Sequence, residues 1–176
     1  MENKRLIIEY REYSSEEELP NEYKELYAKA IEATKGSYAP YSNFHVGAAL
    51  MLDSGEILTG SNQENIAYPS GLCAERVALF GAHANRPERS VEAIAIVAET
   101  GGSITEKYAF PCGACRQVMI ESQQRAGKNI KVLIGSRGKI LMVDSVTDLL
   151  PFVFDGLEAQ NAWKHKREGS IKKEKG

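Results

Sequence analysis

The sequence predicts a three-layer α/β/α sandwich, in which a mixed β-sheet of about five strands lies between layers of helices. The chain has 176 residues, of which 43% are hydrophobic and 26% charged, as is typical of one globular domain. Its apolar segments alternate between helical spacing and short β-type runs, which implies crossover connections within one sheet. We expect residues 1–160 to form this domain, with residues 1–19 as an N-terminal extension.

The first helical segment has recognisable start and stop signals. Ser15 and Glu18 have the spacing of a capping box, which predicts a helix start. The helix is expected to restart at Pro20 and to continue to about Thr34, because apolar residues recur there at helical spacing. Gly36 is suited to end it.

The remaining elements alternate between strands and helices. Residues 44–62 contain two apolar runs around a turn at 53–55, a pattern that predicts a β-hairpin. Residues 91–98 (VEAIAIVA) read as a buried strand. The other expected elements are helices over 72–84 and 112–126, two short strands around Arg137 and Gly138, and a brief helix near 147–151.

Charge and hydropathy exclude some classes of partner. Residues 164–176 hold six basic and two acidic side chains, so the rest of the chain is acidic, which disfavours a nucleic-acid groove. We interpret residues 161–176 as a disordered basic tail rather than an RNA contact. No segment approaches the ~20 apolar residues that cross a bilayer, and the charged N-terminal sequence is unlike a signal peptide. A cytoplasmic protein with no membrane partner is expected.

Three cysteines are the main candidates for chemistry. An odd number without a secretory signal disfavours disulfides, which leaves metal ligation or reactive thiols. Cys112 and Cys115 lie three apart at a predicted helix start, where their side chains share a face and the helix dipole favours thiolates. Cys73 lies at a second helix start. Three ligands with a vacant fourth position are typical of catalytic zinc.

Charged neighbours complete this picture. At the first turn of a helix, Glu75 can lie beside the metal without binding it, which is the placement of a proton carrier. Three thiolates leave the site negative. Hydrogen bonds from Arg76 and Arg116 would withdraw that charge and restore the Lewis acidity of the metal. The alternative is that both arginines are ordinary surface residues.

Two other classes of protein stay open on the residues alone. Cys112 and Cys115 could form a redox pair, with Cys73 incidental. A structural zinc module without catalysis would need a fourth ligand. The histidines available for that place are His45, His83 and His165, and none is expected to bind.

The cysteine motifs resemble the zinc deaminase signature in its three-cysteine form. Further segments, YAPYSNFHVGAAL, GSNQENIAYPSGLCAER, FPCGACRQ and DLLPFVF, resemble the small cytidine deaminases in the same order over about residues 25–155. The resemblance implies hydrolytic deamination of cytidine and deoxycytidine to uridine and deoxyuridine, with release of ammonia, as in pyrimidine salvage. It also implies one Zn²⁺ per subunit and a homotetramer whose active sites are completed by neighbouring chains.

The resemblance also implies roles for individual residues. Phe44 would stack near the pyrimidine, and Asn62 and Glu64 would hold the ribose hydroxyl. The backbone at Ala74 and the side chain of Glu75 would read the base. The preference between ribose and deoxyribose stays open. The nearest alternative is a deaminase for another aminopyrimidine, but residues that bind ribose would have no use with a different sugar.

Aromatic residues and two departures from the family pattern complete the comparison. Tyr68 matches a substrate-binding position. Tyr41 and Phe154 match positions at the pocket edge or the subunit junction, with ordinary aromatic core as the alternative. Gln63 stands where the family usually has an aliphatic residue, and Ile66 where it usually has Ala. Both flank the expected ribose grip, so they bear on sugar preference.

Overall fold

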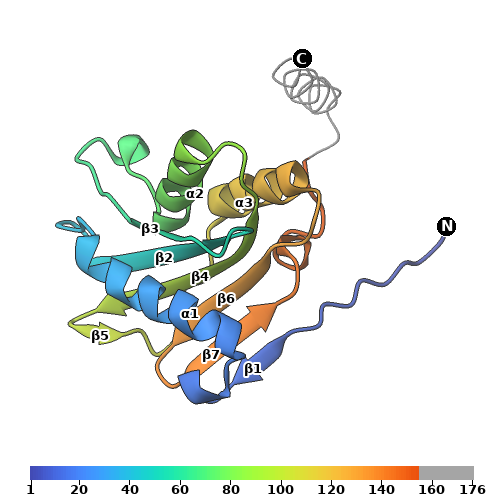
Figure 1. Ribbon diagram of the computed structural model, residues 1–176, viewed down its shortest axis with the longest axis horizontal. Coiled ribbons are helices and arrows are strands. Elements are labelled where there is room, and N and C mark those ends of the chain that lie inside the picture. Colours follow the sequence, from blue (N-terminus) through green and yellow to red (C-terminus); the bar gives the residue numbers. More distant parts are fainter. Residues whose placement is uncertain (155–176) are drawn as a thin grey trace.

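The computed structural model describes residues 1–154 and confirms the α/β/α sandwich (Figure 1). Within that range one mixed sheet of seven strands has the order β1-β7-β6-β4-β2-β3, and the short β5 pairs with β4. Helix α1 covers one face of the sheet, and α2 and α3 cover the other. The predicted tail, residues 161–176, lies outside the described residues, as does the end of the predicted domain at 155–160.

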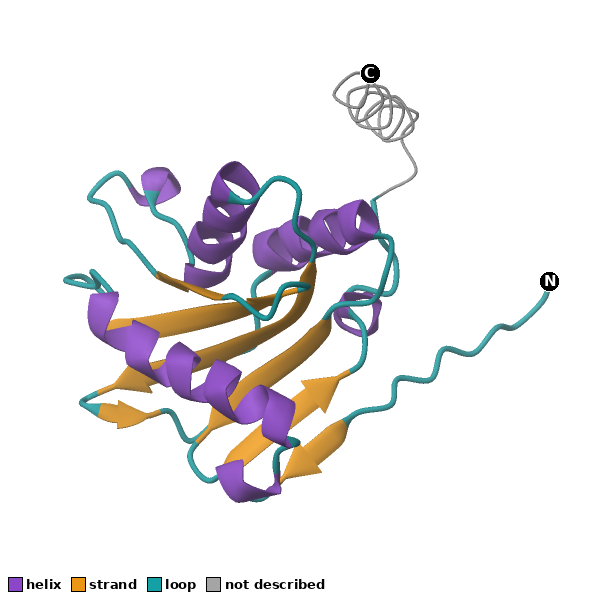
Figure 2. Ribbon diagram, in the orientation of Figure 1, coloured by secondary structure: helices purple, strands orange, loops and turns teal. Residues whose placement is uncertain are grey.

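Figure 2 colours the helices purple and the strands orange. The strands are β1 (Arg11–Tyr13), β2 (Phe44–Leu52), β3 (Ile57–Ser61), β4 (Val91–Thr100), β5 (Ser103–Ile104), β6 (Lys131–Ser136) and β7 (Lys139–Val143). The α-helices are α1 (Asn21–Ala33), α2 (Ala74–Asn85) and α3 (Gly113–Ala126). The 3-10 helices are η1 (Glu16–Glu18), η2 (Thr34–Gly36), η3 (Tyr68–Ser70) and η4 (Val146–Leu149). None of the described helices is long and apolar enough to cross a membrane.

Two sequence predictions about local structure need correction. The sheet has seven strands rather than about five, because β1 and β5 are three and two residues long and carry no periodic pattern. The predicted capping box at Ser15 is also wrong. The carboxylate of Glu18 instead accepts a hydrogen bond from the backbone N–H of Ser14 at 2.8 Å, and the side chain of Ser15 caps nothing.

Strand β4 separates two hydrophobic cores. Ala93, Ala95 and Val97 face helix α1, whereas Ile94 and Ile96 face helices α2 and α3. All five side chains are buried, because successive residues of a strand point to opposite faces and both faces are covered. This explains why the strand appears in the sequence as an unbroken apolar run.

The topology brings the N-termini of α2 and α3 to the same edge of the sheet. Strand β2 is antiparallel to both β3 and β4, so β3 and β4 run in the same direction. Helix α2 follows β3, and helix α3 follows β4 and the short β5. Both helices therefore begin near the carboxyl ends of these strands, the usual place for a ligand site in an open α/β sheet.

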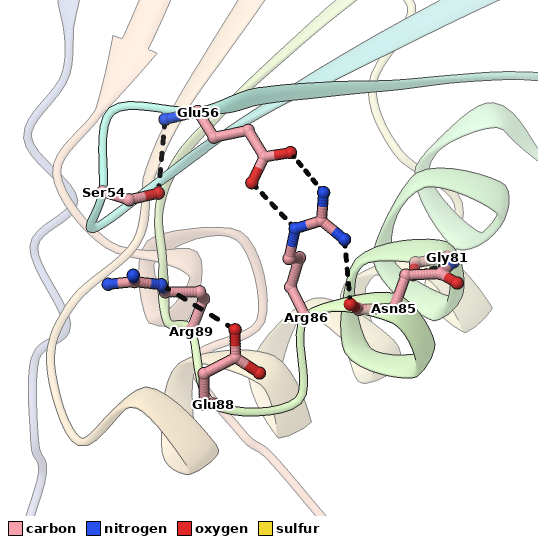
Figure 3. Close-up of polar contacts among 7 residues, drawn as sticks. All are labelled: Ser54, Glu56, Gly81, Asn85, Arg86, Glu88 and Arg89. Atoms are coloured by element: carbon pink, nitrogen blue, oxygen red, sulfur yellow. Dashed lines mark hydrogen bonds and ion pairs between the residues drawn. The ribbon is translucent and has the colours of Figure 1, made fainter.

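The opposite end of α2 is held by an ion pair. Arg86 donates through Nε and Nη2 to the two carboxylate oxygens of Glu56, both at 2.9 Å, and through Nη1 to the carbonyl of Asn85 (Figure 3). Glu56 immediately precedes β3. The bidentate geometry fixes the C-terminus of α2 relative to the β2–β3 hairpin.

A glycine allows α2 to approach the sheet closely. A Cβ atom at Gly60 of β3 would lie 2.5 Å from the backbone N of Ala78 and 2.8 Å from the carbonyl O of Ala74. No side chain fits there, since the obstructing atoms belong to the helix backbone. Gly60 thus sets the distance between β3 and the start of α2.

Gly60→Ala is expected to lower the free energy of unfolding by about 1–3 kcal/mol, the usual cost of overpacking. Gly81→Ala is a matched control, because Gly81 lies in α2, the helix that packs against Gly60, and a Cβ there would meet nothing within 4 Å. That control should be neutral or stabilising by up to about 1 kcal/mol. Urea unfolding of both variants measures the difference. Equal stability of the Gly60 variant and the wild type would contradict the close approach.

Candidate active site

Three cysteine sulfurs meet where α2 and α3 begin. Cys73 immediately precedes α2, Cys112 immediately precedes α3, and Cys115 lies in the first turn of α3. The sulfur of Cys112 lies 4.0 Å from that of Cys73 and 3.4 Å from that of Cys115. Disulfide sulfurs would be about 2.05 Å apart, so all three are free thiols. Cys73 belongs to the cluster, contrary to the redox-pair alternative.

The cluster fits a zinc ion. Tetrahedral zinc with bonds of about 2.3 Å to sulfur places its ligands about 3.8 Å apart, and all three sulfurs here lie within 4.8 Å of one another. No histidine or carboxylate of residues 1–154 joins them as a further ligand. His45 and His83 contact Asn43 and Ser122 instead, and His165 lies outside the described residues.

The two arginines play different parts. Nη2 of Arg76 donates to the Cys73 sulfur at 3.7 Å, and its buried Nε has no hydrogen-bond partner in the described part of the chain. Arg116 differs from the expectation, because it donates to the carbonyls of Pro111 at 2.8 Å and Leu149 at 2.7 Å. The guanidinium of Arg116 therefore contacts the backbone beside Cys112 and not the sulfurs.

The electrostatics of the cluster favour a thiolate at Cys73. Hydrogen bonds from the Cys115 thiol and from Arg76 hold the pKa of the Cys73 thiol well below its usual value. Proximity to Cys73 and burial raise the pKa of the Cys115 thiol. Negative charge at Cys73 is thus favoured next to the guanidinium. Binding of a metal cation would favour loss of the others.

Glu75 is a buried carboxyl group at the start of α2. Its exposed fraction is 4%, and charged groups are almost never buried so deeply without a partner. Burial is the main factor that raises the pKa of Glu75 above its ordinary value. The charge of Cys73 also raises this pKa and a hydrogen bond with Cys115 lowers it, so the carboxyl group lies beside the sulfur cluster.

A cleft of about 550 Å³ opens beside Cys73 and Arg76, large enough for a small ligand. Four further predicted site residues line it, namely Tyr41, Asn62, Glu64 and Tyr68. The remaining lining residues are Ser42, Gln63, Asn65, Gly71 and Leu72. The other predicted site residues are not part of the lining, namely Phe44, Ala74, Glu75, Cys112, Cys115, Arg116 and Phe154.

Backbone pairing joins the cleft wall to the cysteine cluster. Gln63 exchanges two hydrogen bonds of 2.9 Å with Leu72, the residue before Cys73. On its other side, this segment pairs with Tyr38 through Asn62 and Glu64. The side chain of Gln63 also donates to the carbonyl of Gly36 at 3.0 Å. The segment containing Asn62 and Glu64 is thus fixed relative to Cys73.

The predicted aromatic residues are exposed rather than part of the core. Tyr41 and Tyr68 meet edge to face with ring centroids 6.1 Å apart, and both are at least half exposed. Phe154 is 72% exposed, and its carbonyl accepts a hydrogen bond from Gln117 at 2.9 Å. The core alternative for Tyr41 and Phe154 is therefore wrong. Phe44 at the start of β2 is also partly exposed.

Comparisons with known proteins agree with this architecture. Residues 20–129 match the family described as cytidine and deoxycytidylate deaminase zinc-binding region. A cytidine deaminase of Halalkalibacterium halodurans is 43% identical over 129 residues, which cover 73% of this chain and 91% of that protein. A solved cytidine deaminase of Burkholderia pseudomallei has a TM-score of 0.64 at 42% identity, covering 74% of this chain and 97% of that one. A solved cytidine deaminase of Mycobacterium tuberculosis has a TM-score of 0.60 at 34% identity, covering 77% of this chain and 98% of that one.

The fold and the site define a class of α/β/α zinc protein in which two helix N-termini carry three cysteine ligands beside a cleft. All three cysteines lie within the matched range, and the match covers more than half of the chain. The protein belongs to the cytidine and deoxycytidylate deaminase family. Residues 1–19 precede the matched range.

Arg76→Ala is expected to weaken zinc binding by about 10–100-fold, the usual effect of losing a hydrogen-bond partner of a metal ligand. The variant removes the donor to Cys73 and one positive charge beside three sulfurs. Competition with a chromogenic chelator measures the affinity. Arg89→Ala, which removes the same charge near Asp53, should retain zinc like the wild type. Identical zinc affinity in the Arg76 variant would contradict the charge argument.

Proposed function

We propose that this protein is a cytidine deaminase, which hydrolyses cytidine and deoxycytidine to uridine and deoxyuridine with release of ammonia. One observation carries the proposal. Three sulfurs that fit zinc lie where two helices begin, with the buried carboxyl group of Glu75 in the first turn of one of them, next to a cleft lined by Asn62 and Glu64. Family membership and the curated relatives, which are cytidine deaminases, support it.

Proton transfer is the role proposed for Glu75. Cys73, Cys112 and Cys115 would hold zinc, which would supply a Lewis acid that acidifies water. Glu75 accepts a proton from water and delivers it to N3 of the cytosine ring, which makes C4 more electrophilic. After the water oxygen has bonded to C4, Glu75 carries the second proton to the departing amine. Water and cytidine are thereby converted to uridine and ammonia.

Other residues of the chain orient the substrate. Asn62 and Glu64 hold the sugar, the backbone at Ala74 and the carboxyl group of Glu75 read the base, and Phe44 stacks against the pyrimidine. Tyr68 lines the cleft. A positioned substrate turns attack on C4 into an effectively intramolecular step.

The assembly is proposed to be a homotetramer with shared active sites. Tyr68 and Phe154 are 78% and 72% exposed, and exposed aromatic side chains are typical of surfaces that bind a partner. Tyr41 and Phe154 would then meet a neighbouring subunit at the edge of the pocket. We propose a cytoplasmic enzyme of pyrimidine salvage, acting on a nucleoside without a nucleic-acid or membrane partner.

Glu75→Gln is expected to keep stoichiometric zinc but lose at least about 10²–10⁴-fold in kcat, the usual contribution of a general acid–base group. Ammonia release from cytidine and zinc content are measured on the same sample. Glu99→Gln on β4, the same change away from the cysteines, serves as the control and should be fully active. Wild-type turnover by the Glu75 variant would refute its assigned role.

Light scattering coupled to gel filtration tests the assembly. The native protein is expected at about four times its chain mass of 19.4 kDa. Phe154→Asp should shift the mass towards smaller species, because a charge would have to be buried in the subunit contact. Phe80→Asp changes an aromatic residue on α2 that is 48% exposed and belongs to no predicted site. A monomeric wild type would contradict the shared site.

A further inference from the structure

A short polar segment before β2 holds the carboxylate of Glu64. Oε2 of Glu64 accepts from the backbone N–H groups of Tyr41 at 2.9 Å and Ser42 at 3.3 Å. Its Oε1 accepts from the Ser42 hydroxyl. The same hydroxyl accepts from the backbone N–H of Phe44 at 3.1 Å. Ser42 therefore connects the residue expected to hold the sugar with the residue expected to stack on the base.

The hydrogen-bond capacity of Glu64 is nearly used. An ionised carboxylate offers about four acceptor sites, two on each oxygen. Two backbone donors occupy Oε2, and the Ser42 hydroxyl occupies one site on Oε1. Hydrogen bonds from the Ser42 hydroxyl and from the backbone of Tyr41 lower the pKa of Glu64, so the group stays ionised. One acceptor site, on Oε1, remains for a ligand.

Asn62 has one unused hydrogen-bond donor, which complements the unused acceptor site of Glu64. Its Oδ1 accepts from the Ser37 hydroxyl and from the backbone N–H of Val46 at 2.7 Å. Its Nδ2 donates to the carbonyl of Phe44 at 2.9 Å. Since the N–H of Val46 can only donate and a carbonyl can only accept, the orientation of the amide is fixed. Both acceptor sites are then filled, and one N–H remains for a ligand.

We propose that Ser42 is a positioning residue that restricts the Asn62–Glu64 pair to a single sugar hydroxyl. That hydroxyl must donate its hydrogen to Oε1 of Glu64 and accept a hydrogen bond from Nδ2 of Asn62. Without the Ser42 hydroxyl, Oε1 would regain an acceptor site, and the carboxylate would lose one of the contacts that fix it. The inference rests on the proposed deamination of nucleosides.

Ser42→Ala is expected to raise KM for cytidine about tenfold or more, the scale of one lost hydrogen bond to a charged group. Because Glu75 and the cysteines are untouched, kcat should change by less than about threefold and zinc content should not change. Ser42→Thr, which keeps the hydroxyl, should restore KM. A purely structural role would lower the unfolding midpoint and kcat together.

Ser54→Ala is a matched control. The Ser54 hydroxyl accepts from the backbone N–H two residues on, at Glu56, as Ser42 does at Phe44, but it holds no carboxylate and lies in the β2–β3 turn. The KM of the Ser54→Ala variant for cytidine should equal that of the wild type. If the wild type deaminates cytidine and Ser42→Ala has the same KM, the inference is overturned and the proposed function stands. No turnover of cytidine by the wild type would overturn both.

Substrate analogues test the polarity of the contact. Removal of the contacted hydroxyl, identified by comparing 2′-deoxycytidine and 3′-deoxycytidine, should reduce kcat/KM at least about tenfold. Fluorine at the same carbon can accept weakly but cannot donate, so it should not restore the loss. In Ser42→Ala the discrimination between hydroxyl and hydrogen should shrink. Full activity of the fluoro analogue would overturn the assigned donor and acceptor roles.

Discussion

The convergence of two helix N-termini at one edge of the sheet is the constraint on which the site depends. Strands β3 and β4 run in the same direction on either side of β2, so the helices that follow them begin on the same side. Each helix start brings unpaired backbone N–H groups and a positive dipole end. These groups favour the negative charge that three cysteines placed there carry when they bind a metal cation. Elsewhere on these helices, the same residues would be ordinary buried thiols.

The surplus of negative charge at such a site has to be offset by groups of the chain. Three thiolates exceed the charge of one divalent ion, and Arg76 is the guanidinium in contact with the sulfurs. Arg116 follows Cys115 as Arg76 follows Glu75, yet its side chain is satisfied by two carbonyls. Equal spacing in the sequence therefore produces unequal roles. One arginine contacts the Cys73 sulfur, and the other contacts the backbone beside Cys112.

Residue patterns predicted most of the fold because its helices and long strands have clear periods. The strands β1 and β5 were missed because two or three residues carry no period, and their pairing depends on neighbours far along the chain. The cysteine cluster was predictable because i, i+3 spacing and helix-start signals are local. The role of Ser42 was not, since a serine in a turn has no distinguishing signal, and its contact with Glu64 joins segments 22 residues apart.

The cleft and the cysteine cluster are mechanically one unit. Asn62 and Glu64 flank Gln63, whose backbone pairs with Leu72, and the next residue is Cys73. A displacement of the segment that contains Asn62 and Glu64 would therefore move Cys73. The segment is held on its other side by Tyr38 and by the side-chain contact of Gln63 with Gly36. Gln63 stands where the family pattern has an aliphatic residue, and its side chain adds this contact, so the departure from the pattern strengthens the cleft wall beside Cys73.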